Sequence, residues 1–397
     1  MVPSMRAMPP LLFLLALGNL VIGSSAFLIG GIVGDIAQDL GVGAPAVGQA
    51  MTVYALSTAL FAPLLVVATG RWPRKRALLL ALLIFTFGNA LCAMAHSLPL
   101  LLLGRAVMGA GSMFTPVAAA IALASVAPAR RGTALSLVFL GMSLSYVIGL
   151  PLGAWVSLHY GWHVTLWAMT AASALMCVAA AYGVPAAVQA PGASFAGLAA
   201  VLRRPEVLAM LLTTMAYFCA IFTTVSYFTP VLQALVPMPG STLSLTLMAF
   251  GLAGVAGTLI GGAAHDRFGP LRTMGVQMPA LATTMLLLPF TAGHYGAMVV
   301  VLLVWACAGF GLMTPQQNRL AELAPAQAPL LLSLNSSMLY IGTALGAAVG
   351  GAALGNLGFA RLPWVGAPFA LLGVALVLLP GRIVARRGAL RVDNRSR

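Results

Sequence analysis

The stretch LLFLLALGNLVIGSSAFLIGGIV, residues 11–33, runs for 23 residues without a charged side chain. A helix needs about 20 predominantly apolar residues to cross a bilayer. A signal peptide is the alternative for an apolar stretch near the N-terminus, but this one continues to Val33 without a convincing small-residue cleavage site. We therefore predict that it forms the first membrane span.

The whole chain has the same character. Of its 397 residues, 61% are hydrophobic and only 7% are charged, whereas soluble domains carry about 25% charged residues. This composition excludes a soluble enzyme and a disordered protein. The net charge of +14 does not indicate nucleic-acid binding, because the basic residues stand in short clusters between apolar runs rather than on one folded face. The chain is predicted to be an all-α polytopic protein of the lipid bilayer.

Eleven further apolar runs follow the first one. Twelve spans in 397 residues leave about 33 residues for each span and its loop, so no large soluble domain fits. The predicted spans are 11–33, 46–69, 77–95, 98–127, 133–157, 164–185, 207–232, 242–264, 273–293, 296–318, 329–354 and 364–380.

Lys and Arg residues gather on one side of these spans. If the N-terminus lies in the cytoplasm, 18 of the 20 Lys and Arg residues fall in cytoplasmic segments; Arg361 falls in an outer loop and Arg105 inside a span. Positively charged residues are retained on the cytoplasmic side of a membrane. The distribution predicts both termini in the cytoplasm.

The chain repeats itself at about half its length. Parallel repeats of six helices place a substrate site between the two halves, so the predicted fold is two pseudo-symmetric six-helix bundles. The matching pairs are TGRWPRKR at 69–76 and HDRFGPLR at 265–272, Ala-Pro-Ala at 127–129 and 324–326, and the glycines and methionine at 109, 111 and 113 and at 309, 311 and 313.

The repeat and the charges divide the chain into four parts. The N-terminal bundle is predicted over 1–185 and the C-terminal bundle over 207–381. A flexible cytoplasmic linker, 186–206, joins them. The basic tail, 382–397, is expected to be disordered near anionic lipid.

Three motifs resemble those of a known family. GAAHDRFG at 262–269 has the spacing G-x-x-x-D-R-x-G, RAVMGAG at 105–111 has R-x-x-x-G-x-G, and GLPLG at 149–153 precedes GWH at 161–163. They resemble the major facilitator superfamily and, within it, the sugar-efflux and purine-efflux branch of the drug/metabolite:proton antiporters, whose third motif continues to G-W-R. The loop after span 2 departs from the pattern, with Gly70 and Pro73 in place of Asp and Gly.

The resemblance implies a monomeric transporter, not an enzyme. It implies export of a small molecule across a bacterial inner membrane by two rocking halves, in exchange for protons. It places spans 5 and 11 between the halves. Small residues four apart let helices approach closely, and in the resembled fold these spans slide between the halves. The alternative is ordinary packing without sliding. The small residues are Gly149, Gly153, Gly342, Gly346 and Gly350.

The resembled loop motif also implies a latch at the cytoplasmic ends of the helices. The Asp266–Arg267 pair is its centre, with Arg71 and Arg272 as the remaining basic residues; a solvated loop pair is the alternative.

Arg105 is the formal charge that falls clearly within a span. An ionisable group in a membrane indicates function by default. Arg105 lies about 10 Å below the outer end of span 4, and spans 1 and 4 are neighbours in the resembled fold. We expect Arg105 to pair with Asp35, at the outer end of span 1, in one conformer. The alternative is a structural arginine that donates hydrogen bonds to carbonyls at helix ends.

Proton coupling is in question at span 1. Relatives in the resembled branch often carry Glu there within a T-E-F triplet, whereas this chain reads Ser25-Ala26-Phe27. A desolvated carboxylate would be the natural proton carrier, and no other span has a central Asp, Glu or His. Asp35 with Arg105 is then the predicted coupling pair, unless the substrate carries the proton or transport is uncoupled.

Polar and aromatic residues at the centres of spans are the candidate substrate ligands. An amide and aromatic lining suits neutral or weakly amphipathic small molecules. Helix packing is the alternative for each residue. The candidates are Asn19, Ser24, Tyr54, Ser112, Thr115, Tyr146, Tyr217, Phe218, Phe222, Gln316, Asn335 and Tyr340.

Three other functions are alternatives to export. An importer or uncoupled facilitator would use the same fold. A membrane-embedded enzyme would need a cluster of His, Asp or Glu in the membrane, which the sequence does not provide. A sensor would need an added soluble domain. No metal or cofactor is expected, because the four cysteines lie far apart within apolar runs and are predicted to be packing residues.

Overall fold

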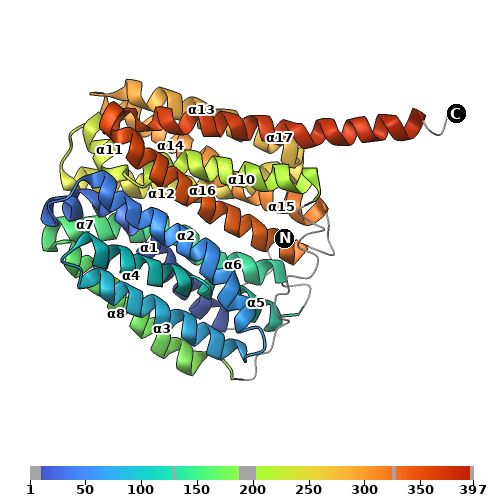
Figure 1. Cartoon of the computed structure of the whole chain (residues 1–397). Coiled ribbons are helices and arrows are strands. Elements are labelled where there is room, and N and C mark those ends of the chain that lie inside the picture. The colour runs from blue at the N-terminus through green and yellow to red at the C-terminus, as the bar shows by residue number, and fades with distance from the viewer. Residues whose placement is uncertain (1–9, 128–130, 187–202, 324–327, 394–397) are drawn as a thin grey trace. The chain divides into compact units, whose positions relative to one another are not determined.

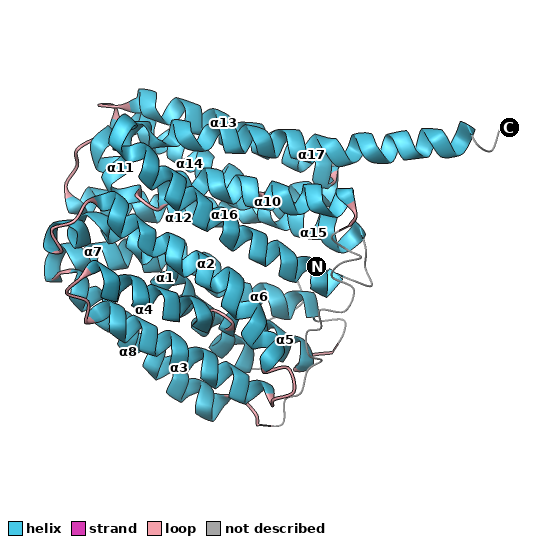
Figure 2. Ribbon diagram, in the orientation of Figure 1, coloured by secondary structure: helices cyan, strands magenta, loops and turns pink. Residues whose placement is uncertain are grey.

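A computed structural model describes residues 10–127, 131–186, 203–323 and 328–393 (Figure 1). These residues form helices joined by short loops, with no strand among them (Figure 2). The helices of the first half are α1 (Pro10–Asp39), α2 (Ala44–Ala68), α3 (Arg74–Ala93), α4 (Leu98–Gly111), α5 (Phe114–Ala124), α6 (Arg131–Leu144), η3 (Ser145–Gly149), α7 (Leu150–Tyr160) and α8 (Trp162–Gly183).

The second half has the same alternation of long and divided helices. It contains α10 (Pro205–Val225), α11 (Phe228–Leu235), α12 (Gly240–Phe268), α13 (Pro270–Leu287), η4 (Leu288–Thr291), α14 (Tyr295–Gly311), α15 (Met313–Leu323), α16 (Ala328–Leu357), η6 (Phe359–Arg361) and α17 (Leu362–Asp393).

Twelve segments of the described residues are long and apolar enough to cross a membrane. They coincide with the twelve predicted spans to within a few residues at most ends. The prediction of an all-α protein with twelve spans is confirmed.

Proline divides the fourth and tenth spans at matching places. Proline lacks an N–H group and clashes with the carbonyl four residues before it. Pro116 follows the turn between α4 and α5, and Pro315 follows the break between α14 and α15. The carbonyls four residues earlier belong to Ser112 and Gly311, which lie at the ends of α4 and α14.

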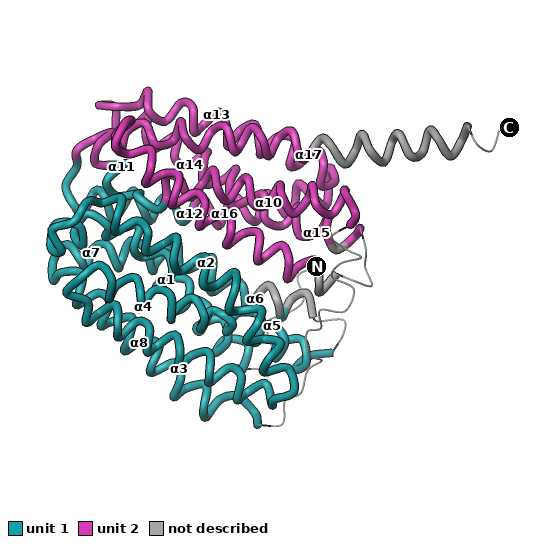
Figure 3. The backbone as a smooth tube through the Cα atoms, in the orientation of Figure 1, with its two compact units in different colours: residues 1–194, 226–232, 238–252 teal, residues 195–225, 233–237, 253–397 magenta. Residues whose placement is uncertain are grey.

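The described chain forms two compact units (Figure 3). Unit 1 contains 1–194, 226–232 and 238–252, and within it α1 packs on α2, α6, α7 and α8, while α4 packs on α2 and α3. Unit 2 contains 195–225, 233–237 and 253–397, and within it α10 packs on α16 and α17, while α13 packs on α14 and α17.

The units differ from the predicted bundles in one respect. Residues 226–232 and 238–252, predicted in the C-terminal bundle, are grouped with unit 1. The hydroxyl of Thr229 donates a hydrogen bond of 2.8 Å to the carbonyl oxygen of Gly31 on α1. A methyl group at Gly251 would meet the main chain of Tyr146. These contacts attach both segments to unit 1. Most of the predicted linker lies outside the described residues.

The glycine faces serve close packing inside each unit. Gly149 lies against Ser24 and Gly153 against Leu28, both on α1 of unit 1. In unit 2, a methyl group at Gly346 would lie 2.5 Å from the carbonyl oxygen of Cys219, on α10. The packing alternative therefore describes these faces in this structure.

The C-terminal tail is helical where it is described. Helix α17 continues from the last span to Asp393 (Figure 1), so the expectation of a disordered tail is wrong up to that residue. Ala, Leu and Arg favour helix, and extending an existing helix needs no new nucleus.

Candidate functional site

Arg105 is buried within unit 1 among main-chain oxygens. Its side chain is 1% exposed. The guanidinium donates from Nε to the carbonyl of Ala50 (3.2 Å), from Nη1 to that of Ser25 (3.0 Å) and from Nη2 to that of Ala26 (2.7 Å). Its carbon Cζ lies 4.5 Å from the ring centroid of Tyr54. Carbonyl dipoles on α1 and α2, together with one aromatic face, therefore surround the charge.

The remaining contacts of Arg105 are weak. Nη2 lies 3.4 Å from the sulfur of Met51, and Nη1 lies 3.9 Å from that of Met108. A thioether is a poor acceptor. Among the described residues, no carboxylate forms an ion pair with Arg105.

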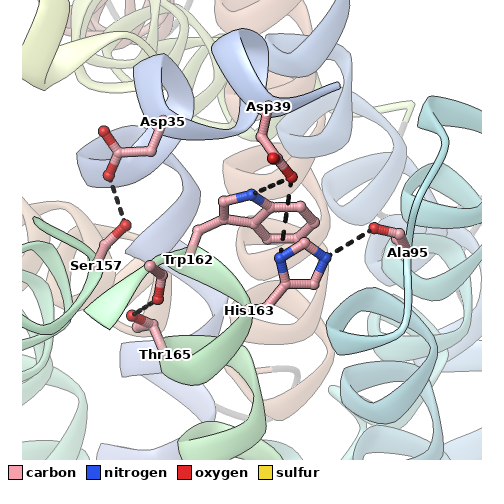
Figure 4. A network of polar contacts seen from close by, with 8 residues as sticks. Asp35, Asp39, Ala95, Ser157, Trp162, His163 and Thr165 are labelled. Carbon is pink, nitrogen blue, oxygen red and sulfur yellow. Dashed lines mark hydrogen bonds and ion pairs between the residues drawn. The ribbon is translucent and has the colours of Figure 1, made fainter. Parts of the chain in front are cut away.

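Asp35 lies elsewhere in unit 1 and takes a different partner. Its carboxylate accepts a hydrogen bond of 2.5 Å from the hydroxyl of Ser157 on α7 (Figure 4). Asp35 is nine residues beyond Ala26 on α1, which is about 13 Å along a helix. This conformer therefore does not contain the expected pair. The partners of Arg105 are carbonyls, as in the alternative, but they lie within α1 and α2 and not at helix ends.

Asp39, at the end of α1, joins two further elements (Figure 4). Its Oδ2 accepts a hydrogen bond of 3.0 Å from the indole of Trp162 and lies 3.9 Å from Nδ1 of His163. The other ring nitrogen of His163 lies 3.2 Å from the carbonyl oxygen of Ala95. A carbonyl only accepts, so that nitrogen is the donor. The network ties the end of α1 to the start of α8 and to the loop after α3.

An amide links three helices near the other end of α1. Nδ2 of Asn19 donates a hydrogen bond of 3.0 Å to the carbonyl of Val138 on α6. Its Oδ1 accepts one of 2.7 Å from the hydroxyl of Thr115 on α5. The expectation placed Asn19 and Thr115 among the candidate ligands, and the structure brings them together. Both polar atoms of this amide are engaged within unit 1.

Unit 2 has a related cluster on α10, α15 and α16. The hydroxyl of Thr214 donates a hydrogen bond of 2.5 Å to Oδ1 of Asn335. Nε2 of Gln316 lies 3.0 Å from the same hydroxyl and also donates to the carbonyl of Met210. Oε1 of Gln316 is buried without a partner among the described residues.

Aromatic rings continue along α10 from this cluster. The rings of Tyr217 and Phe218 have centroids 4.6 Å apart, and those of Phe218 and Phe222 are 6.0 Å apart. The hydroxyl of Tyr217 donates to the sulfur of Met313 at 3.3 Å. The three aromatic candidates thus form one row in unit 2.

The other candidates are distributed within their own units. The hydroxyls of Tyr54 and Ser112 share a hydrogen bond of 2.7 Å beside Arg105, and Tyr146 stacks on Phe27 with centroids 4.6 Å apart. Ser24 is buried against Gly149, and Tyr340 is half-buried on α16.

The four latch residues, Arg71, Asp266, Arg267 and Arg272, are exposed. Arg267 lies over the ring of Phe268 at 5.2 Å. At this end of α12, Nε2 of His265 lies 3.9 Å from Oε1 of Glu322, and Asp266 takes no part in that contact.

Two buried polar residues of the spans, one within the unit 2 cluster and one outside the clusters, were not among the candidates. Thr214 is the hydroxyl between Gln316 and Asn335, and its place three residues before Tyr217 in an apolar span was the available signal. Asn89 is fully buried and accepts a hydrogen bond of 2.5 Å from Ser25. The amide in that span was the signal.

Comparison with known proteins identifies the fold. The sequence profile of the Major Facilitator Superfamily matches residues 15–328 and 238–392. The chain belongs to the major facilitator superfamily. It is 30% identical to the inner membrane transport protein YdhP of Escherichia coli (strain K12), over 94% of this chain and 96% of that protein.

Two further comparisons agree with this assignment. A probable sugar efflux transporter of Pasteurella multocida (strain Pm70) is 27% identical, over 92% of this chain and 90% of that protein. A crystal structure of a bacterial homologue of the human lysosomal transporter Spinster has a TM-score of 0.78 at 16% identity, covering 94% of this chain and 96% of that one. The resemblance seen in the motifs is confirmed, and this protein is a multi-pass transporter of the superfamily.

Proposed function

We propose that this major facilitator exports a small neutral or amphipathic molecule by alternating access, in exchange for protons. The chemistry of the clustered side chains supports this substrate class. The amide, hydroxyl and aromatic side chains that gather in each unit are uncharged; the buried charges beside them are Arg105, enclosed by carbonyls, in unit 1 and Arg319 in unit 2. An uncharged lining favours molecules that carry no full charge.

The direction of transport is proposed from the relatives and the charges. The similar protein of Pasteurella multocida is named for sugar efflux. The distribution of Lys and Arg supports a cytoplasmic position for both termini. The protein would then act as a monomer in the inner membrane.

Proton exchange is proposed at Asp35 and Arg105. These are an acid at the outer end of α1 and a base buried on α4. Their pairing would belong to another conformer of the cycle than the one described. At the cytoplasmic side, Asp266 with the arginines of its own loop would act as a latch, and Asp266→Asn should slow flux without lowering the melting temperature.

The experiment is transport in proteoliposomes under an imposed pH gradient. A panel of sugars, nucleosides, amino-acid derivatives and antibiotics identifies what is carried. We expect efflux-direction transport that is accelerated when protons flow the opposite way. Transport in which the gradient changes neither rate nor accumulation would contradict proton exchange.

An uncoupled facilitator or importer is the second candidate. One observation favours it: the span-1 position that carries an acid in the resembled branch is Ala26 here, and it is 2% exposed. Accumulation against a concentration gradient separates the candidates, because an uncoupled facilitator only equilibrates its substrate.

A further inference from the structure

The amide of Gln316 has a fixed orientation within unit 2. Its Nε2 donates to the carbonyl of Met210 and to the hydroxyl of Thr214. The reverse orientation would set Oε1 against the carbonyl of Met210, and two acceptors cannot bond to one another. The side chain is 0% exposed. Oε1 is therefore a buried acceptor that lacks a donor among the described residues.

The amide of Asn335 is fixed by the same hydroxyl. Thr214 accepts from Gln316 and uses its single hydrogen to donate to Oδ1 of Asn335. Both hydrogens on Nδ2 of Asn335 are left outside this set of bonds. The cluster thus holds one spare acceptor and one spare donor group.

The related cluster of unit 1 shows that the spare acceptor is particular to unit 2. Val138 and Asn335 are 197 residues apart, close to the spacing of the sequence repeats. At Val138 the carbonyl takes the bond from Asn19, whose other polar atom accepts from Thr115. In unit 1 both polar atoms of the amide have a partner, whereas in unit 2 Oε1 of Gln316 has none among the described residues.

Among the described residues, no charged side chain forms a hydrogen bond with the cluster, although Arg319 is buried three residues after Gln316. The charged side chain next along α15 is Arg319, and its Nη1 points to the sulfur of Met274 on α13 at 3.6 Å. The neighbouring groups on α10 are the rings of Tyr217, Phe218 and Phe222. Residues three and four apart on a helix share a face, so Thr214 shares a face with Tyr217 and Phe218.

We infer that Gln316 and Asn335 select a transported molecule whose polar group is neutral and both donates and accepts hydrogen bonds, as a hydroxyl or an amide does. The donor of that group binds Oε1 of Gln316, and its acceptor binds Nδ2 of Asn335, beside an aromatic row that packs against the apolar faces of the molecule. This rests on the proposed transport function and narrows its substrate class.

Charged groups fit the cluster poorly for a physical reason. A carboxylate only accepts hydrogen bonds and would face the lone pairs of Gln316, while an ammonium only donates and would face the N–H groups of Asn335. Burying an ammonium without a counter-charge is also costly, and the nearest charged group, the guanidinium of Arg319, has the same sign. A buried acceptor without a donor costs free energy as well, and binding a hydroxyl removes that cost.

The test uses three probes that differ at one atom group. They are phenyl β-D-glucoside, its 6-amino-6-deoxy analogue and phenyl β-D-glucuronide. Binding to the purified full chain and flux in proteoliposomes are measured for each probe. For the natural chain we expect the neutral probe to be favoured over both charged ones by about 10-fold or more. Equal or reversed preference, or no binding of the neutral probe, overturns the inference.

Two variants then locate the selectivity. Asn335→Asp keeps the oxygen that accepts from Thr214 and replaces the spare donor by an acceptor. The ratio of the affinity for the neutral probe to the affinity for the ammonium probe should therefore fall by about 10-fold. Gln316→Leu should weaken binding of the neutral probe by a similar factor. Unchanged ratios in both variants would place the selectivity elsewhere and overturn the assignment.

Asn89→Asp is the matched control. Asn89 is another buried span amide, but its Oδ1 accepts from Ser25 and its Nδ2 donates to the carbonyl of Phe85. It should lower the melting temperature without changing the probe ratios. The wild-type preference does not depend on any variant folding. If a charged compound from the transport panel is carried while the neutral probe is not, the inference fails and the proposed transport function stands.

Discussion

Nη2 of Arg105 donates a hydrogen bond of 2.7 Å to the main-chain carbonyl oxygen of Ala26. The buried guanidinium therefore binds a main-chain carbonyl at the residue where the resembled branch often carries a carboxylate. Two further carbonyls, of Ser25 and Ala50, complete the arrangement. The planar fork of the guanidinium is suited to it, because its donors point in several directions at once.

Replacing Arg105 by Lys should test whether this fork is required. A lysine ammonium is a single point of charge on a flexible stem and cannot reach three carbonyls on two helices together. Hydrogen bonds to charged groups are each worth about 1.5–3 kcal/mol. We expect Arg105→Lys to lower the free energy of unfolding by about 2–4 kcal/mol, to lower the melting temperature in detergent and to reduce flux at least about 10-fold. Full flux in this variant would contradict a role for the guanidinium.

Variants of Asp35 and Ser157 distinguish the role of the carboxylate charge from the role of the hydrogen bond between the two side chains. Asp35→Asn removes the charge but leaves an oxygen that can accept from Ser157, whereas Ser157→Ala removes only the donor. If Asp35 carries the proton, flux in Asp35→Asn should no longer respond to a pH gradient, while Ser157→Ala should keep its response. An equal response in the two variants would refute the coupling proposal.

Two glycines on α16 form a matched pair for helix packing. A methyl group at Gly346 would lie 2.5 Å from the carbonyl oxygen of Cys219, whereas nothing lies within 4 Å of one at Gly355. Gly346→Ala should force α16 away from α10 and destabilise the protein by about 1–3 kcal/mol. Gly355→Ala should be neutral or slightly stabilising, since alanine favours helix over glycine. Thermal unfolding checks both, and equal melting temperatures would show that the close approach is unimportant.

Trp162 and Asp39 provide a test of the network at the end of α1. Trp162→Phe keeps an aromatic ring at this 3% exposed position and removes the 3.0 Å hydrogen bond to the carboxylate. The expected loss is about 1.5–3 kcal/mol, seen as a lower melting temperature. His159→Ala is the control, because that exposed ring lies 2.8 Å from the carbonyl of Trp155 on its own helix. A control as damaging as Trp162→Phe would count against the network.

Particular residues show where sequence reasoning stopped. Arg105 was found because a charge inside an apolar run is conspicuous. Its expected partner, Asp35, lies about 13 Å further along α1 than Ala26, whose carbonyl accepts a hydrogen bond from Arg105. Gln316 and Asn335 were found as span-centre amides, but Thr214 between them was not, because threonine is common in membrane helices and only the packing of α10 brings it to both. The glycine spacing was read correctly as a close-packing face. The helices that these faces contact, α1 and α10, were not predicted.

The sequence by itself determined the twelve spans and the repeat of two halves. Those features depend on local properties: a membrane helix satisfies its backbone within its own turn, so length, apolar content and charge at the ends are sufficient to define it. Tertiary structure decided which face of each helix meets which neighbour. A rotation of a helix by one residue changes every side-chain partner without changing its hydropathy, and for that reason the carbonyl cage of Arg105 and the open amides of Gln316 and Asn335 became visible only in the folded chain.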